Sequence, residues 1–177
     1  VINRGKHKAE KEYLWMVRSV MEKLVIFHYD MGSRSGSVIE SLVSQYHFKG
    51  YLQCDGFAGY ETAFKTNPDV RLVNCMAHIR RDFEHALGEN KKEAEYGLAQ
   101  IQYMYRIEHC CDKAGLSSDG RKAKRRELTR PIMEAMKTWM ETEGIKYSPQ
   151  SLIGKAVSYA YTRWDNMMRC LEDGRLL

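Results

Sequence analysis

A chain of 177 residues is long enough to bury one ordinary hydrophobic core, or one core with a smaller bundle attached. Its 44% hydrophobic and 29% charged residues and three prolines are typical of a folded domain and exclude fibrous or low-complexity proteins. No apolar run approaches the roughly 20 residues needed to cross a bilayer, and the start has no signal-peptide pattern. We therefore expect a cytoplasmic protein. The net charge of +5 favours a polyanionic partner, although solubility alone explains a modest excess.

The five cysteines are scattered along the chain, and no pair has the Cys-x-x-Cys spacing of a redox or zinc motif. Cys75 and His78 are three residues apart and offer two zinc ligands, whereas a structural zinc site takes four. We therefore expect reduced, buried or incidental thiols rather than a zinc centre.

The N-terminal third predicts a hairpin followed by a helix. Residues 1–12 are polar and basic around Gly5 and are expected to form a loop. The apolar and aromatic runs at 13–17 and 23–30 predict two antiparallel strands. A serine-rich turn then leads into residues 38–46, whose apolar side chains recur at helical spacing.

Strands and helices then alternate. A short strand over 51–54 runs into Asp55 and Gly56, a helix follows at about 60–64, and residues 70–76 form another strand. Strands alternating with helices after a hairpin predict an α/β fold in which helices cover the faces of a mixed sheet.

From about residue 80 onward the helical period of 3.6 takes over. Breakers at 115–120 and 144–149 separate the helices, and Pro131 is expected to start or kink one of them. The last helix is predicted to run without interruption from Leu152 to Leu171. Three aromatic residues, Trp139, Tyr159 and Trp164, fall on apolar stripes and are expected to lie in the core rather than to stack on bases.

Asp55 stands where a predicted strand meets a glycine turn. In open α/β sheets, ligands gather at the carboxyl ends of strands, so a carboxylate there is well placed to hold a metal ion. An Asp-Gly pair is also an ordinary turn. Asp30, at the end of the second hairpin strand, is an alternative carboxylate, although a simple strand-to-turn exit explains it better.

Three segments of the sequence favour a functional role for Asp55 over a simple turn. Residues 52–60 (LQCDGFAGY), residues 75–83 (CMAHIRRDF) and the C-terminal stretches 156–165 (AVSYAYTRWD) and 171–176 (LEDGRL) occur in this order. Together they resemble motifs of the insertion sequence 66 transposases, a family of bacterial DDE-type enzymes, and they cover nearly the whole chain.

The resemblance implies a partial ribonuclease-H-like core over residues 1–88, with its first strand mostly missing, and a helical insertion over 89–177. It also implies a DNA transposase that uses Mg²⁺ or Mn²⁺ to cleave and transfer strands, with Asp55 as the second carboxylate of the acidic set. The first aspartate and the final glutamate of that set have no counterpart in these residues. The isolated chain is therefore predicted to be inactive.

Basic residues suggest where DNA would lie. His78, Arg80 and Arg81 follow the predicted strand over 70–76 and lie on the same rim as Asp55 if the strands are parallel, where cations hold phosphates. With the resemblance, this role and a solvated first helical turn explain them equally well. The densest basic cluster is expected either to contact DNA or to form a solvated helix face. Its members are Arg121, Lys122, Lys124, Arg125, Arg126 and Arg130. The resemblance further implies a homo-oligomer acting on transposon ends and target DNA.

Two other readings remain open. A non-catalytic DNA-binding or assembly module, derived from a degenerate transposase, would keep the fold and lack the outer carboxylates. A ribonuclease-H-like nuclease unrelated to transposition would carry no helical insertion, and the long helical stretch after Arg81 argues against it.

Overall fold

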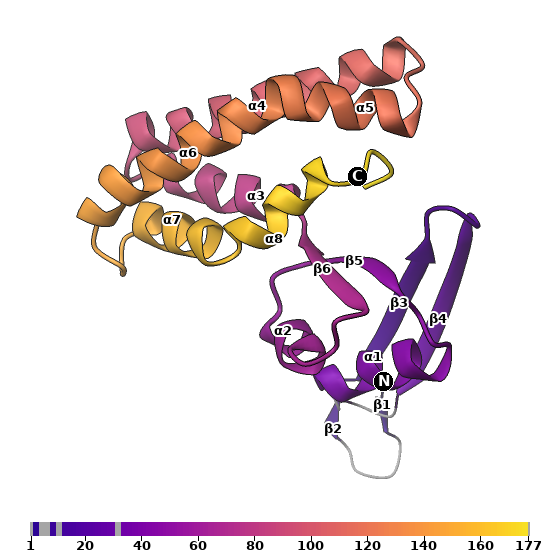
Figure 1. The fold of residues 1–177 in the computed structure, drawn as a ribbon. Coiled ribbons are helices and arrows are strands. Elements are labelled where there is room, and N and C mark those ends of the chain that lie inside the picture. Colours follow the sequence, from indigo (N-terminus) through magenta and orange to yellow (C-terminus); the bar gives the residue numbers. More distant parts are fainter. Residues whose placement is uncertain (1, 4–7, 10–11, 31–32, 177) are drawn as a thin grey trace. The chain divides into compact units, whose positions relative to one another are not determined.

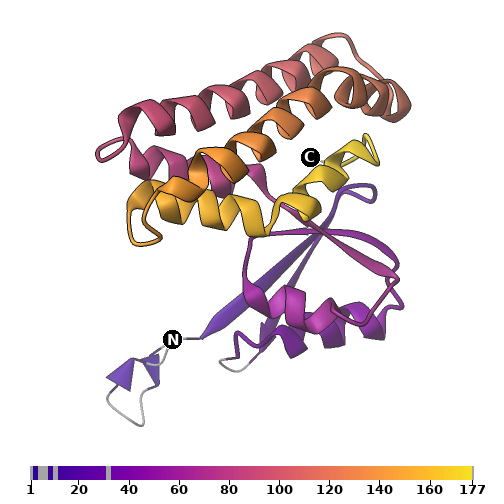
Figure 2. The same ribbon diagram turned by 60° about the vertical axis from the view of Figure 1, so that its left-hand side comes forward.

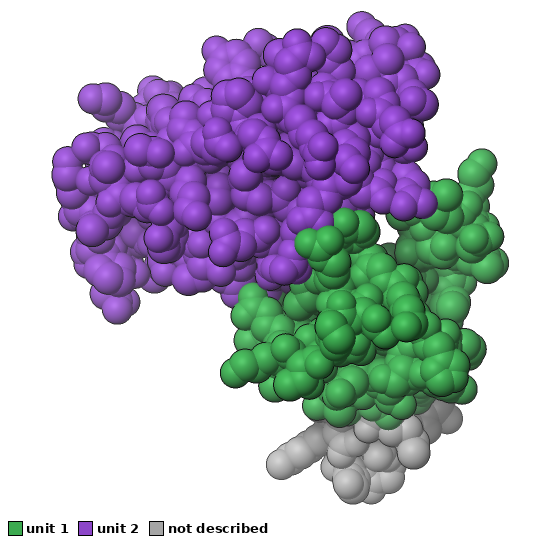
Figure 3. Space-filling model, in the orientation of Figure 1, with its two compact units in different colours: residues 1–52, 57–72 green, residues 53–56, 73–177 purple. Residues whose placement is uncertain are grey.

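The structure is a computed structural model that describes residues 2–3, 8–9, 12–30 and 33–176 (Figure 1). It has a mixed α/β fold, as the sequence predicts, and it divides into two compact units (Figure 3). The first unit comprises residues 1–52 and 57–72, and the second comprises residues 53–56 and 73–177.

The first unit contains the predicted hairpin. Strands β3 (Tyr13–Ser19) and β4 (Leu24–Asp30) pair antiparallel, with Tyr13 opposite Asp30 and Ser19 opposite Leu24. Trp15 anchors β3, because it is buried, its indole N–H donates to the Ser33 carbonyl at 3.2 Å, and its ring meets Tyr60 edge-on. Within the expected N-terminal loop, β1 (Ile2–Asn3) and β2 (Lys8–Ala9) form a second, very short antiparallel pair.

Helices α1 (Gly36–Gln45) and α2 (Ala58–Phe64) complete the first unit (Figure 2). The side chain of Ser35 caps α1 by accepting a hydrogen bond from the Ser37 N–H, and Val38, Ile39 and Val43 form its buried face. A Cβ on Gly36 would lie 2.2 Å from the Gly59 carbonyl oxygen, so the close approach of these two helices requires glycine there.

Strands β5 (Gly50–Cys54) and β6 (Val70–Asn74) form the remaining pair. The Gly50 N–H donates to the Asp69 carbonyl at 2.8 Å and the Cys75 N–H to the Cys54 carbonyl at 3.1 Å, the offset of a parallel ladder. The expected single mixed sheet is not seen, because the strands that the structure describes form separate two-stranded pairs. Alternation predicts that a segment is a strand, but it does not specify the strand beside it.

The second unit is mainly helical and holds the largest core. Helices α4 and α6 run side by side, and α3 packs against α4 and α7 (Figures 1 and 2). Its fully buried side chains include Phe83, Ile101, Met133, Ile153 and Trp164. The helices are α3 (Met76–Ala86), α4 (Lys91–Lys113), α5 (Ser118–Lys124), α6 (Arg130–Thr142), α7 (Leu152–Thr162) and α8 (Trp164–Met168). Shorter segments are a π-helical turn (Arg125–Thr129) and 3₁₀ turns at Gly144–Lys146 and Arg169–Leu171.

The two compact units do not correspond to the predicted division into a catalytic core and an insertion. Helix α3 packs on α4 and α7 and belongs to the helical unit, and the boundary of the catalytic core at residue 88 stays a prediction. The predicted last helix is interrupted at Arg163, whose φ of −110° and ψ of 3° separate α7 from α8. Pro131 stands in the first turn of α6, as predicted. Within the described residues, no helix combines the length and apolar character needed to cross a membrane.

Candidate active site around Asp55

Asp55 directly follows the last residue of β5 and is half-buried. The side chain of Asn74, the last residue of β6, donates from Nδ2 to the Asp55 carbonyl oxygen at 3.3 Å. The carboxyl ends of two parallel strands therefore meet at Asp55, which is the placement that the sequence predicts for a ligand-binding carboxylate.

Tyr159 on α7 and Arg163, the residue directly after this helix, contact both backbone polar groups of Gly56, the residue after Asp55. The Gly56 N–H donates to the Tyr159 hydroxyl at 3.1 Å, and the Gly56 carbonyl accepts from Arg163 Nη2 at 2.8 Å. The Arg163 guanidinium also lies 4.1 Å from the centre of the Tyr159 ring. We call Tyr159 and Arg163, together with these bonds to Gly56, the Gly56 clamp.

Gly56 has no room for a side chain. A Cβ there would lie 2.1 Å from Arg163 Nε and 2.5 Å from the Tyr159 hydroxyl. The Asp-Gly pair is thus a turn, and it is also a contact point for a helix more than 100 residues away. The apolar spacing around Tyr159 predicts a core position and gives Arg163 no role, because residue spacing carries no signal for such a distant contact.

The groups around Tyr159 have opposing effects on the pKa of its phenol. Burial raises the pKa of its phenol above the ordinary value, and the nearby carboxylates of Asp82 and Asp55 raise that pKa further. The bond from the Gly56 backbone and the Arg163 charge act in the opposite direction on the pKa. The phenol therefore stays neutral at physiological pH, and its oxygen is available to accept the bond from Gly56.

Asp55 does not form a complete metal site with its described neighbours. Nowhere in residues 12–30 and 33–176 do three or more His, Cys, Asp or Glu side chains gather as a metal-binding group. Asp55 offers one hard oxygen ligand of the kind that Mg²⁺ and Mn²⁺ take. Cys75 and His78 likewise lack the further ligands of a zinc site, and the buried Nδ1 of His78 has no hydrogen-bond partner in the described part of the chain.

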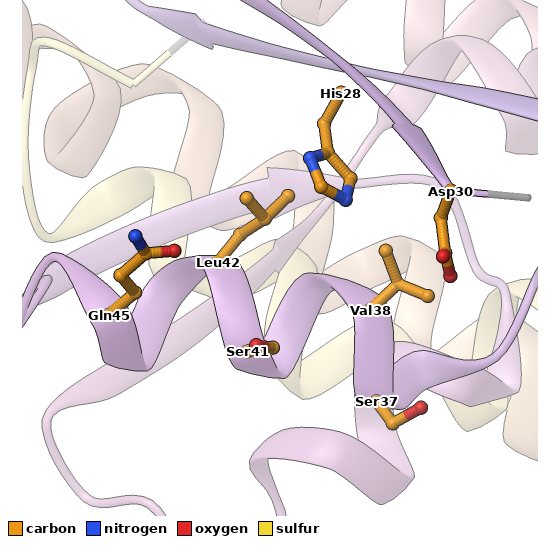
Figure 4. A pocket seen from close by; sticks show the side chains of 7 residues that line it. All are labelled: His28, Asp30, Ser37, Val38, Ser41, Leu42 and Gln45. Atoms are coloured by element: carbon orange, nitrogen blue, oxygen red, sulfur yellow. The ribbon is translucent and has the colours of Figure 1, made fainter.

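Asp30 lies in the first unit, in a hollow of about 250 Å³ between β4 and α1 (Figure 4). His28, two residues earlier on the same strand, points into the same hollow. The other lining residues, Ser37, Val38, Ser41, Leu42 and Gln45, come from α1 and carry no carboxylate or imidazole. Two potential ligands are fewer than a metal site needs, so Asp55 is the better-placed carboxylate.

The residues predicted to contact DNA differ in their exposure and in their partners within the protein. On α3, Arg81 is exposed, and Arg80 is partly exposed and pairs with Glu84 at 2.7 Å. In the basic cluster, Lys124 is exposed and pairs with Glu127 at 2.9 Å, whereas Arg126 is exposed and donates from Nε to the Leu171 carbonyl at 3.2 Å. Lys122 is half-exposed.

Arg125 lies in the interior, contrary to the expectation that it faces DNA. Its guanidinium donates from Nε and Nη2 to the Glu108 carboxylate at 2.7 and 2.8 Å. It also donates to the backbone carbonyls of Cys170, Asp173 and Leu176, at 3.0, 3.1 and 2.6 Å respectively. Arg121 donates to the same Glu108 carboxylate at 2.8 Å and to Asp112. Arg121 therefore ties α5 to α4, and Arg125, in the π-helical turn, ties the C-terminal segment to α4. We do not assign these two arginines to a DNA surface.

Comparison with known proteins decides the family. The family model described as "Transposase IS66 family" matches residues 1–177, the whole chain. The chain belongs to this transposase family. The resemblance that rests on the three sequence motifs is thereby confirmed.

Two curated relatives of this IS66 chain come from Sinorhizobium fredii. The uncharacterized protein y4qI is 27% identical over 97% of the chain, and the uncharacterized protein y4hP is 28% identical over 75% of it. The chain spans 34% and 27% of the lengths of these relatives. No solved structure matches the chain.

Proposed function

We propose that this chain forms part of the catalytic core of a DNA transposase with a ribonuclease-H-like fold, and that Asp55 is one of its metal-binding carboxylates. The observation that carries the proposal is the position of Asp55. It stands where parallel strands β5 and β6 end together, in a chain that matches the transposase family throughout.

In this proposal the complete protein uses Mg²⁺ or Mn²⁺, which supplies charge stabilisation for phosphodiester cleavage and strand transfer when bound. Because no group of three or more His, Cys, Asp or Glu side chains gathers among the described residues, the isolated chain is predicted to be inactive. Asp55 would hold the ion through its carboxylate, while Asn74 and the Gly56 clamp hold its backbone.

The test of this function is strand cleavage by the full-length protein on DNA that carries the ends of its own element. We expect cleavage with Mg²⁺ or Mn²⁺ and none after chelation by EDTA. If the full-length protein binds this DNA but never cleaves it, the alternative function, a non-catalytic DNA-binding or assembly module, replaces the proposed one.

We also propose that cations of α3 and of the basic cluster contact the DNA backbone. The candidates on α3 are Arg80 and Arg81, beside His78, and those of the basic cluster are Lys122, Lys124 and Arg126. Phosphate contacts release counterions, so each lost contact reduces the slope of log K against log [salt] by about 0.9 on duplex DNA.

The double variant Arg80→Gln/Arg81→Gln of the full-length protein is therefore expected to bind DNA more weakly, with a salt slope smaller by about 1 to 2. Fluorescence anisotropy at several salt concentrations measures both quantities. The matched control is Lys155→Gln, which removes one exposed cation from α7. If the double variant has the same affinity and salt slope as the parent protein, Arg80 and Arg81 on α3 do not contact DNA.

A further inference from the structure

The Gly56 clamp joins two parts of the sequence that lie more than 100 residues apart, within one compact unit. Both backbone polar groups of Gly56 are used, one by Tyr159 and the other by Arg163. The neighbouring residue toward the N-terminus is Asp55, so the clamp fixes the backbone from which the Asp55 carboxylate projects.

Local structure prepares Arg163 for this contact. The helix stops at Thr162, and Arg163 adopts a non-helical backbone conformation before α8 begins at Trp164. Its Nη1 donates to the Tyr159 carbonyl at 3.3 Å and to the Thr162 hydroxyl at 2.9 Å, and its guanidinium lies over the Tyr159 ring. These bonds orient Nη2 toward Gly56, so little side-chain freedom remains to be lost in the contact.

The position of Arg163 destabilises the fold in two ways, and we take this as a sign that the contact with Gly56 has a function. The Nε of Arg163 is buried and has no hydrogen-bond partner among the described residues, and an unpaired buried donor is destabilising. The interruption between α7 and α8 also gives up continuous helical hydrogen bonding at this point. A shorter or apolar residue would avoid the unpaired donor, but it would not reach the Gly56 carbonyl.

We infer that Tyr159 and Arg163 are positioning residues for Asp55: they hold the Asp55-Gly56 turn in the geometry that its carboxylate needs. The inference rests on the proposed function of Asp55, and it adds two residues that act through the backbone without touching the substrate. It also gives the helical unit a role in the site, because α7 belongs to that unit.

The clamp itself is tested by hydrogen exchange in the full-length protein. Tyr159→Phe removes the acceptor of the Gly56 N–H and keeps the ring, so the Gly56 amide is expected to exchange about 10-fold faster, the equivalent of one hydrogen bond. The matched control is Tyr161→Phe on the same helix, whose exposed hydroxyl bonds only to Glu141 among the bonds described and does not approach Gly56. Gly56→Ala is a second probe, because its Cβ displaces both clamp side chains while leaving them in the sequence.

The positioning role is tested by the Mn²⁺ dependence of strand cleavage. In Tyr159→Phe and Arg163→Met, the Mn²⁺ concentration for half-maximal cleavage is expected to rise about 10-fold, with a smaller loss of rate at saturating Mn²⁺. Lys155→Met, which removes an exposed cation from α7, is expected to leave both values unchanged. A merely structural role would lower the melting temperature without moving the Mn²⁺ midpoint.

Hydrogen exchange and the Mn²⁺ midpoint distinguish failure of the clamp, of the positioning role and of the proposed function. Unchanged exchange of the residue 56 amide in both Tyr159→Phe and Gly56→Ala overturns the clamp. Faster exchange with an unchanged Mn²⁺ midpoint overturns the positioning role. Full cleavage by Asp55→Asn overturns the proposed function instead, and the exchange result still decides whether the clamp exists.

Discussion

Replacing Asp55 by asparagine in the full-length protein is expected to reduce strand cleavage by more than about 100-fold. Asparagine keeps the size of the side chain and the backbone bond to Asn74, but it removes the negative charge that a hard divalent cation requires. Loss of groups that merely orient a metal ligand typically costs 10- to 100-fold in metal affinity or activity, and Asp55 is proposed as a ligand itself.

The matched control for this prediction is Asp165→Asn. Asp165 lies on α8 in the same unit, its side chain is 91% exposed, and its ion pair with Lys137 spans 3.6 Å. Cleavage by this variant should equal that of the parent protein. Cleavage by Asp55→Asn within about 3-fold of the parent rate would show that the Asp55 carboxylate takes no part in the reaction, because the losses seen for metal-site residues are far larger.

The largest effect on stability is expected for Arg125→Met, which should destabilise the second unit by about 3–5 kcal/mol, as breaking a buried ion pair does. The substitution leaves the half-buried Glu108 carboxylate with Arg121 alone and frees three backbone carbonyls of the C-terminal segment. Urea unfolding followed by tryptophan fluorescence measures the change, since Trp164 lies in the core of this unit.

Arg130→Met provides the matched control, because Arg130 is exposed and its contact with Glu134 spans 3.9 Å. Its loss should change the free energy of unfolding by less than about 1 kcal/mol. An Arg125→Met variant as stable as this control would contradict the role of Arg125 as the link between α4 and the C-terminal segment.

Acid should weaken the same link. Burial raises the pKa of Glu108, but the hydrogen bonds from Arg125 and Arg121 outweigh it, and the pKa falls below its ordinary value of 4.5. Hydrogen bonds from Arg175 likewise lower the pKa of Asp173 to about 2. Carboxylates with a lowered folded-state pKa stabilise the fold above the unfolded-state value, and this contribution is lost as pH falls through the folded-state value. The stability of the parent protein should therefore decline below about pH 4.5, and Arg125→Met should flatten that decline.

Local sequence patterns predicted most elements of this fold. The hairpin, the helix after Ser35, the strand before Asp55 and the breaks between the later helices follow from spacing, caps and breakers that act over a few residues. Two features depended on distant contacts and could not be predicted in this way. The strands form separate pairs, and the last helix is interrupted at Arg163, where the side chain reaches Gly56.

The sequence predicted the carboxylate of the candidate site, but it did not predict which other side chains contact the site or are buried near it. A carboxylate at a strand end, within a family motif, pointed to Asp55. Charge alone could not separate Arg125, which is buried on Glu108, from Lys124 and Arg126, which are exposed on the same stretch. Neighbouring residues of a helical turn point in different directions, so members of one charge cluster can face the interior or the solvent. The position of the acidic partner Glu108 on α4 determines that Arg125 is the one that faces the interior.

The most direct test of the account is the position of the metal ion. Crystals of the full-length protein bound to its DNA ends and soaked with Mn²⁺ would show the ion by its anomalous scattering. We expect a peak within coordination distance of the Asp55 carboxylate, with Tyr159 and Arg163 still in contact with Gly56. A peak held by other carboxylates, with Asp55 making no contact to it, would contradict the account.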